Sequence, residues 1–133
     1  MKMAKKSTSK VLIVEDSHSI QVIYTTVLEK AGYHITVAAS GSEALETTKA
    51  QPFDVILLDI VLLDMDGITF LQSFGSKEHP ETRVIVMSNM DDPELIEKAS
   101  ALGATRYILK RSLTPKLLLD AVTGALADGP AGV

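Results

Sequence analysis

The chain has 133 residues, of which 46% are hydrophobic, so it is long enough to form one folded domain with a substantial core. It contains no cysteine, which excludes a disulfide framework and a thiolate metal site and agrees with a reducing compartment. Four of the 13 basic residues lie in the first ten positions, so the rest of the chain carries nine basic and 17 acidic side chains. We expect this acidic body to repel nucleic acid and the basic arm to be a solvated tail.

Nothing in the sequence resembles a signal peptide or a transmembrane span. The first ten residues lack an apolar stretch. The densest apolar segment, residues 55–63, is interrupted by Asp59 and is much shorter than the ~18 residues that a span needs. These features predict a soluble, cytoplasmic protein that binds neither nucleic acid nor membranes. We expect a flexible tail at residues 1–9, one domain at residues 10–127 and a second tail at residues 128–133.

Strand-like and helix-like segments alternate along the chain. The apolar or alternating runs predict strands at residues 11–14, 34–38, 54–59, 84–87 and 105–109. A helix start signal follows each strand in turn: Ser17 or Ser19, Ser40 with Glu43, Asp66-Gly67, Asp92-Pro93 and Thr114-Pro115. Turn-forming residues or a proline close four of these helices, near Gly32, before Pro52, at Gly75 and near Gly103, and the last helix reaches about residue 126.

Five strands that alternate with five helices predict an α/β fold with a five-stranded parallel sheet covered on both faces. Since crossover connections are right-handed, the simplest topology is a flavodoxin-like, doubly wound (βα)5 fold with strand order 2-1-3-4-5. The order then reverses between the first and third strands. In sheets of this type, ligands bind at the carboxyl ends of the strands beside that reversal.

Polar side chains occupy the ends of four of the five expected strands. Glu15 and Asp16 follow the first strand, Asp59 ends the third, Ser88 follows the fourth and Lys110 follows the fifth. Because the carboxyl ends of parallel strands share one edge of the sheet, we expect these five side chains to converge there. Their types, three carboxylates, a hydroxyl and an ammonium, are those that phosphoryl transfer requires.

Three carboxylates cannot crowd together unaided, because two unit charges about 4 Å apart repel by about 4 kcal/mol at an effective dielectric near 20. Lys110 can neutralise one of them, and a bound cation can neutralise the rest. An all-oxygen site favours Mg²⁺, and we assign Asp16 and Asp59 as direct ligands and Glu15 as a water-mediated one. Asp59 could then act as the nucleophile and form an aspartyl phosphate, with Ser88 and Lys110 each contacting a phosphoryl oxygen.

From about residue 10 to residue 126, the chain resembles a response-regulator receiver domain of bacterial two-component signalling. The matching features are the pair Glu15-Asp16, Asp59 after an apolar strand, the loop Asp64-Met65-Asp66-Gly67, Ser88, and Lys110 three residues after Tyr107. The resemblance implies that Asp59 takes a phosphoryl group from the phosphohistidine of a sensor kinase or phosphotransfer protein in a Mg²⁺-dependent reaction. It implies a signalling phosphoprotein rather than an enzyme, one that catalyses only its own phosphorylation and dephosphorylation.

The resemblance also implies roles for further residues. The main-chain carbonyl of Val61 would complete the metal site, and Ser88 and Tyr107 would form a switch that responds to the phosphoryl group. The face made by the fourth helix, fifth strand and fifth helix would bind a downstream protein or output domain. A homodimer that forms on phosphorylation is left open, as is whether the domain stands alone or belongs to a longer protein.

Three residues depart from the family pattern. Leu63 and Arg111 stand where the family commonly has proline, and Asn89 stands where it has a small residue that leaves access to Asp59. Without proline, the Lys110–Arg111 peptide bond is either trans, with Lys110 slightly displaced, or a costly cis bond. Val61 and Met90 flank the expected path of a hydrolytic water, and neither side chain can orient it, which predicts slow self-dephosphorylation.

Three alternative functions remain. Residues 64–69 resemble the nucleophile motif of haloacid-dehalogenase-type phosphatases, in which Asp64 would attack phosphate and Asp66 would act as acid and base. Otherwise we expect these two aspartates to shape their loop and cap the helix that begins at Gly67. The fold alone also suggests an FMN carrier, although Glu15-Asp16 would repel phosphate unless a metal intervenes. Finally, the three departures allow a receiver-like module that signals without phosphorylation.

Overall fold

The computed structural model describes residues 9–127, so the tails predicted at residues 1–9 and 128–133 lie outside the described residues apart from Ser9. The elements, in chain order, are β1 (Lys10–Val14), α1 (His18–Lys30), β2 (His34–Ala38), α2 (Gly41–Ala50), β3 (Val55–Asp59), α3 (Gly67–Phe74), η2 (Ser76–Glu78), β4 (Arg83–Ser88), α4 (Pro93–Ala101), β5 (Ala104–Leu109), η3 (Lys110–Ser112) and α5 (Pro115–Ala127). Every predicted strand and helix is present, and two short 3₁₀ helices, η2 and η3, are additional.

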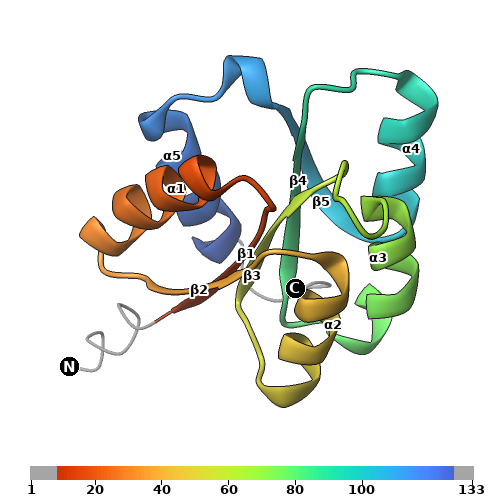
Figure 1. Ribbon diagram of the computed structural model, residues 1–133, viewed down its shortest axis with the longest axis horizontal. Helices are drawn as coiled ribbons and strands as arrows, with labels where there is room; N and C mark the ends of the chain where they lie inside the picture. The colour runs from red at the N-terminus through yellow and green to blue at the C-terminus, as the bar shows by residue number, and fades with distance from the viewer. Residues whose placement is uncertain (1–8, 128–133) are drawn as a thin grey trace.

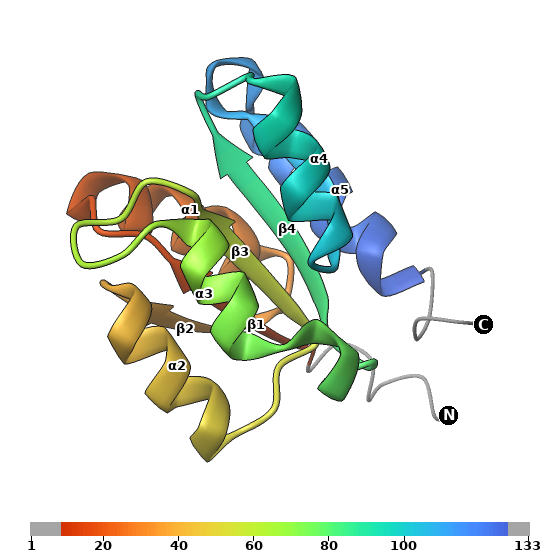
Figure 2. The ribbon, with the colours of Figure 1, turned by 90° about the vertical axis from the view of Figure 1, so that its right-hand side faces the viewer.

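The strands form one parallel sheet in the order β2-β1-β3-β4-β5, which confirms the predicted doubly wound topology. Helices α1 and α5 cover one face of this sheet, and α2, α3 and α4 cover the other (Figures 1 and 2). Within the described residues, no helix combines the length and hydrophobicity needed to cross a membrane. The sheet is therefore a buried central layer whose carboxyl edge is open to loops.

The central strands are apolar on both faces because helices pack against both. In β3, Leu57 points into the core shared with α1 and α5, whereas Leu58 points into the core shared with α2 and α3. Both leucines are fully buried, and burying one such side chain stabilises the fold by about 1.5–3 kcal/mol. This tight packing fixes the position of Asp59, the next residue along β3.

Most helices begin at the predicted capping residues. The side chains of Ser40, Asp66, Asp92 and Thr114 each accept a hydrogen bond from a backbone N–H two or three residues further on, at 2.8–3.1 Å. Ser17 occupies the corresponding position before α1, but its side chain makes no capping hydrogen bond.

One prediction about the loop after β3 is wrong. Asp64 was expected to help cap α3, but its two carboxylate oxygens accept hydrogen bonds of 2.9 Å from the backbone N–H groups of Gly41 and Ser42. These groups belong to the first turn of α2, where unpaired N–H groups attract negative charge. Asp64 therefore ties the β3–α3 loop to a neighbouring helix, while Asp66 alone caps α3.

We predict that Asp64→Asn lowers stability in a pH-dependent way. The N–H groups of Ser42 and Gly41 hold the pKa of Asp64 below its ordinary value of 3.8. A lowered folded-state pKa stabilises the fold above the ordinary aspartate range, and that stabilisation is lost as the pH falls through the lowered pKa. Wild type should melt at a higher temperature than Asp64→Asn at neutral pH, and the difference should shrink on acidification. A difference that is constant with pH would contradict this assignment.

Candidate functional site

The register of the sheet places the five predicted site residues at one edge. Val14 pairs with Leu58, so Glu15 and Asp59, the next residue on each strand, lie at the same level of neighbouring strands β1 and β3. Ser88 pairs with Leu109 at the ends of β4 and β5, and Lys110 follows directly. The predicted convergence of strand ends therefore occurs, and the side-chain contacts described below extend it.

Lys110 forms the centre of this site. Its Nζ atom donates hydrogen bonds to Oε1 of Glu15 and Oδ2 of Asp59, each at 2.9 Å. The side chains of Glu15 and Asp59 are only 2% and 7% exposed, so both charges depend on this partner rather than on water. Removing one member of such a buried ion pair is strongly destabilising because it leaves an uncompensated charge.

Burial and ion pairing shift the pKa values of Glu15 and Lys110 in opposite directions. Burial raises the pKa of Glu15, and hydrogen bonds from the Lys110 side chain and the Ser17 backbone offset part of that rise. Burial opposes the charge on Lys110, but its hydrogen bonds with Asp59 and Glu15 and the charges of both carboxylates outweigh it and raise the pKa of Lys110. The ammonium is thus firmly protonated between the two acids.

The carboxylate of Asp59 is held from both sides. Its Oδ1 atom accepts a hydrogen bond of 3.1 Å from the backbone N–H of Val61, and its Oδ2 atom faces Lys110. Glu15 is similarly fixed, since its Oε2 atom accepts a 3.1 Å hydrogen bond from the backbone N–H of Ser17. These contacts orient the two carboxylates before any ligand arrives.

Glu15, Asp16 and Asp59 together could hold a metal ion. Each offers one carboxylate oxygen, and these three atoms lie within 4.8 Å of one another. Among residues 9–127, the carboxylate of Asp16 has no hydrogen-bond or ion-pair partner, so its charge adds to those of the paired acids. An all-oxygen donor set beside a net negative charge fits a hard divalent cation such as Mg²⁺.

Ser88 and Tyr107 both contact the peptide groups around Met90. The buried hydroxyl of Ser88 accepts a 3.1 Å hydrogen bond from the N–H of Met90, and the hydroxyl of Tyr107 donates one of 2.6 Å to the carbonyl of Met90. Burial raises the pKa of the Tyr107 hydroxyl, which keeps it protonated as a donor. The two predicted switch residues therefore share one segment, the β4–α4 loop.

The structure also shows the surroundings of the three residues that depart from the family pattern. Among the described residues no peptide bond is cis, so the Lys110–Arg111 bond is trans, and Lys110 nevertheless reaches both acids. Leu63 is 90% exposed and leaves its loop uncovered. Asn89 and Arg111 contact each other through a side-chain-to-backbone hydrogen bond of 2.9 Å that the sequence did not predict.

Two further contacts at the site escaped prediction. The side chain of Gln21 donates a 2.6 Å hydrogen bond to the main-chain carbonyl of Glu15, which anchors the acidic pair to α1. A groove of about 320 Å³ runs from Lys110 between α1 and the start of α5, and its apolar lining includes Ile20, Ile23 and Leu113. The α1 side of this groove is open to solvent, since Ile23 is 54% exposed.

The family model and the similar proteins all point to the same family. The sequence model of the response regulator receiver domain matches residues 11–123. The chain is 35% identical over 102 residues to sporulation initiation phosphotransferase F of Bacillus subtilis, which covers 76% of this chain and 81% of that protein. It is 33% identical over 100 residues to the transcriptional regulatory protein ZraR of Escherichia coli, but it spans only 22% of that longer protein.

The structural comparison agrees with the sequence comparison. Chemotaxis protein CheY4 of Vibrio cholerae superposes with a TM-score of 0.82 and 31% sequence identity, over 89% of this chain and 98% of that one. The family match spans most of the described domain and includes all five strand-end residues. The chain belongs to the response regulator receiver domains.

Proposed function

We propose that this receiver domain signals by accepting a phosphoryl group on Asp59. The observation that carries the proposal is the position of Lys110, 2.9 Å from both Asp59 and Glu15, with the carboxylate of Asp16 in the same cluster. A buried carboxylate beside a fixed ammonium and a potential cation site is equipped to attack phosphorus and to neutralise the charge that arrives with it.

The reaction brings together two negatively charged groups, the carboxylate of Asp59 and the phosphoryl group of the donor. An oxygen of Asp59 attacks the phosphorus of a phosphohistidine, the P–N bond breaks, and the imidazole leaves with its electron pair and takes up a proton. The product is an acyl phosphate on Asp59, whose new oxygens need donors. Lys110 already lies beside Oδ2 of Asp59, and the Ser88 hydroxyl can turn from the N–H of Met90 to donate to a second oxygen.

The donor set suits Mg²⁺ as the cofactor of this reaction. Asp16 and Asp59 would be its direct ligands, Glu15 a water-mediated one, and the main-chain carbonyl of Val61 a further ligand. When bound, the ion would offset the charge of the carboxylates and of the phosphoryl oxygens. Lys110 would meanwhile keep Glu15 and Asp59 oriented, because its hydrogen bonds fix one oxygen of each.

A protein is the phosphodonor that this surface favours. The groove beside Lys110 is lined by apolar side chains of α1 and the β5–α5 connection, and Ile23 on its rim is 54% exposed. Such a groove suits the apolar face of a helix that carries the donor histidine. This supports a sensor kinase or phosphotransfer protein as partner, as the resemblance to receiver domains implies.

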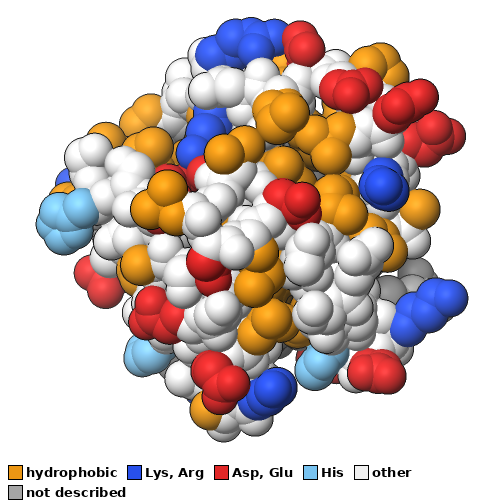
Figure 3. Space-filling model, turned by 45° about the vertical axis from the view of Figure 1, so that its right-hand side comes forward, with side chains coloured by type: hydrophobic (Ala, Val, Ile, Leu, Met, Phe, Trp, Pro, Cys, Tyr) orange, Lys and Arg blue, Asp and Glu red, His pale blue; other side chains and the backbone are white. Residues whose placement is uncertain are grey.

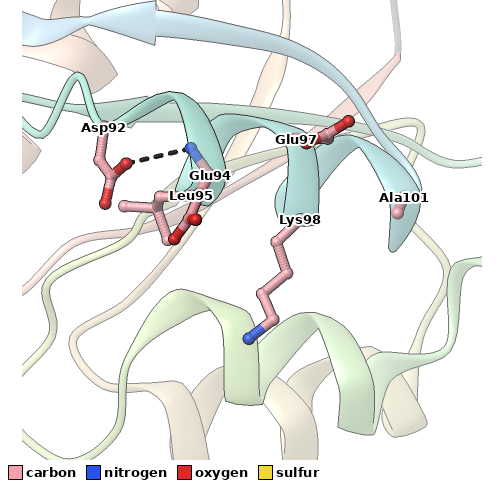
Figure 4. Close-up of a pocket in the computed structure, with 6 residues that line it drawn as sticks. All are labelled: Asp92, Glu94, Leu95, Glu97, Lys98 and Ala101. Carbon is pink, nitrogen blue, oxygen red and sulfur yellow. Dashed lines mark hydrogen bonds between the residues drawn. The ribbon is translucent and has the colours of Figure 1, made fainter.

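We propose that the output surface is the face of α4, β5 and α5. The Tyr107 hydroxyl, which holds the carbonyl of Met90, would give up this bond when Ser88 turns to the phosphoryl group. Along α4, an open hollow is lined by Leu95 and the charged side chains of Asp92, Glu94, Glu97 and Lys98 (Figure 4). On the side of the molecule that Figure 3 shows, apolar and acidic side chains lie next to one another. A downstream protein, an output domain or a second copy of the domain would dock on the α4–β5–α5 face.

The phosphatase alternative loses support from the fold. Asp64 would have to present a free oxygen to phosphate, yet both its oxygens accept hydrogen bonds from the start of α2. A module that signals without phosphorylation remains the second candidate, since Asn89 and Arg111 lie directly beside Ser88 and Lys110. An FMN carrier is not supported, because the loop after β1 presents Glu15 and Asp16.

We expect Mg²⁺ and phosphoramidate, a small P–N donor, to add one phosphoryl group to the wild-type protein. Asp59→Asn should remove the reaction because an amide cannot act as the nucleophile. Asp64→Asn, the same substitution five residues further on, serves as the matched control and should react normally. Intact mass spectrometry would detect the adduct. A reaction lost in Asp64→Asn and kept in Asp59→Asn would favour the phosphatase, and no adduct on wild type would favour the contact-only module.

We expect the phosphorylated protein to lose its phosphoryl group slowly. Val61 and Met90, which are 57% and 46% exposed, have no polar group in their side chains to orient an attacking water. The adduct should persist far longer than seconds after the donor is removed by rapid desalting, in the presence of Mg²⁺. Val61→Gln supplies an amide at the rim and should shorten the lifetime. A wild-type lifetime of seconds would contradict the proposal.

We expect millimolar Mg²⁺ to raise the melting temperature of the wild-type protein, because a ligand that binds only the folded state stabilises it. Asp16→Asn should reduce this rise. It should also raise the melting temperature without Mg²⁺, since it removes one of three neighbouring negative charges. Glu46→Gln, at a carboxylate that is 80% exposed on α2, makes the same charge change elsewhere and should alter neither. Equal Mg²⁺ responses in all three proteins would exclude the acidic cluster as the site.

A further inference from the structure

Two connections at the carboxyl edge of the sheet are joined by a set of contacts around Arg111. The backbone N–H of Arg111 donates a 2.9 Å hydrogen bond to Oδ1 of Asn89, and its guanidinium donates one of 3.3 Å to the main-chain carbonyl of Asn89. The guanidinium also forms a 3.0 Å ion pair with Asp91. We call these contacts, made by Asn89, Asp91 and Arg111, the loop clasp.

The loop clasp joins the neighbours of two residues that would bind the phosphoryl group. Asn89 follows Ser88 directly, and Arg111 follows Lys110 directly. The clasp therefore holds the backbone next to Ser88, on the β4–α4 loop, beside the backbone next to Lys110, on the β5–α5 connection. The β4–β5 pairing that ends at Ser88 and Leu109, and the hydrogen bond from Tyr107 to the carbonyl of Met90, also join these two parts of the edge.

The two halves of the clasp depend on each other chemically. A proline at position 111 would have no N–H to donate, so the side chain of Asn89 would lose its partner. A small apolar residue at position 89 would leave the N–H of Arg111 without this acceptor. The side chain of Asn89 and the backbone N–H of Arg111 are thus complementary.

We propose that Asn89 and Arg111 are positioning residues that hold Ser88 and Lys110 at the spacing required to bind the phosphoryl group on Asp59. This inference rests on the proposed function. Asn89 would then assist phosphorylation, whereas a side chain that narrows access to Asp59 would hinder it. The reason is that Oδ1 of Asn89 accepts a hydrogen bond from the backbone of Arg111. If Asn89 narrowed access to Asp59, removing its side chain would speed phosphorylation. If Asn89 holds the loop clasp together, removing its side chain slows phosphorylation.

The contacts within the clasp differ in importance. The Arg111 guanidinium and the Asp91 carboxylate are 55% and 66% exposed, and ion pairs in such surroundings contribute little. The hydrogen bond from the Arg111 N–H joins the backbone of one loop to the short side chain of the other, so it restrains their spacing directly. We therefore assign most of the positioning to Asn89.

The test compares four variants under saturating Mg²⁺ and varied phosphoramidate. Asn89→Ala removes the acceptor, and the maximal phosphorylation rate should fall about three- to tenfold, the factor expected for one hydrogen bond between neutral groups. The donor concentration for half-maximal rate should change less, since donor access is not altered. Asn89→Asp keeps an acceptor and should recover most of the rate. Arg111→Ala keeps the backbone N–H and should lower the rate no more than about twofold, as should Asp91→Asn.

An unchanged or faster reaction in Asn89→Ala would overturn the proposal and favour a side chain that narrows access to Asp59. A second measurement on the unphosphorylated proteins is independent of the chemistry. By NMR, Asn89→Ala should speed hydrogen exchange of the Arg111 amide and shift the amide signals of Ser88 and Lys110, whereas Arg111→Ala should leave the Ser88 signal near its wild-type position. Unmoved Ser88 and Lys110 signals in Asn89→Ala would also overturn it. If wild type accepts no phosphoryl group, the proposed function fails, and the clasp is judged on the NMR result alone.

Discussion

The ammonium of Lys110, shared between Glu15 and Asp59, is the interaction on which the rest of the site depends. Two buried carboxylates on neighbouring strands would repel each other and lack solvation, and a single cation 2.9 Å from both compensates them. One positive charge does not balance two carboxylates and the adjacent Asp16. The fold thus stabilises a site with more carboxylates than ammonium groups, and this excess of acidic groups would favour the binding of a divalent cation.

The parallel sheet makes this arrangement possible. Strands β1, β3 and β4 reach the carboxyl edge from runs of buried apolar residues, so the last buried residue fixes the direction of the polar residue at the strand end. Leu58 and Val14 pair in register, and their successors, Asp59 and Glu15, are therefore brought together without a flexible loop between them. Hydrophobic packing thus brings the two carboxylates together, and their hydrogen bonds with Lys110 and the backbone then orient them.

The fold and the five strand-end residues could be predicted because their signals are local. Apolar runs, caps such as Ser40 and Asp66, and polar residues at strand ends each occupy a few consecutive positions, and the parallel topology converts them into a shared edge. Two of the contacts that were missed join residues far apart in sequence. Asp64 caps a helix that begins 23 residues earlier, and the Asn89 side chain binds an amide 22 residues later. Periodicity carries no information about such pairings, and the residue types allow many partners.

Met90 connects these findings to switching. Its N–H is held by Ser88 and its carbonyl by Tyr107, so both proposed switch residues restrain the same segment of the β4–α4 loop. If Ser88 turns to a phosphoryl oxygen, the N–H of Met90 loses its partner, and the loop moves unless another contact holds it. The loop clasp restrains this segment on either side of Met90, because Arg111 contacts both Asn89 and Asp91. A tight clasp would therefore favour binding of the phosphoryl group while resisting the loop movement that carries the signal to α4, so the same contacts that assist phosphorylation would limit the response to it.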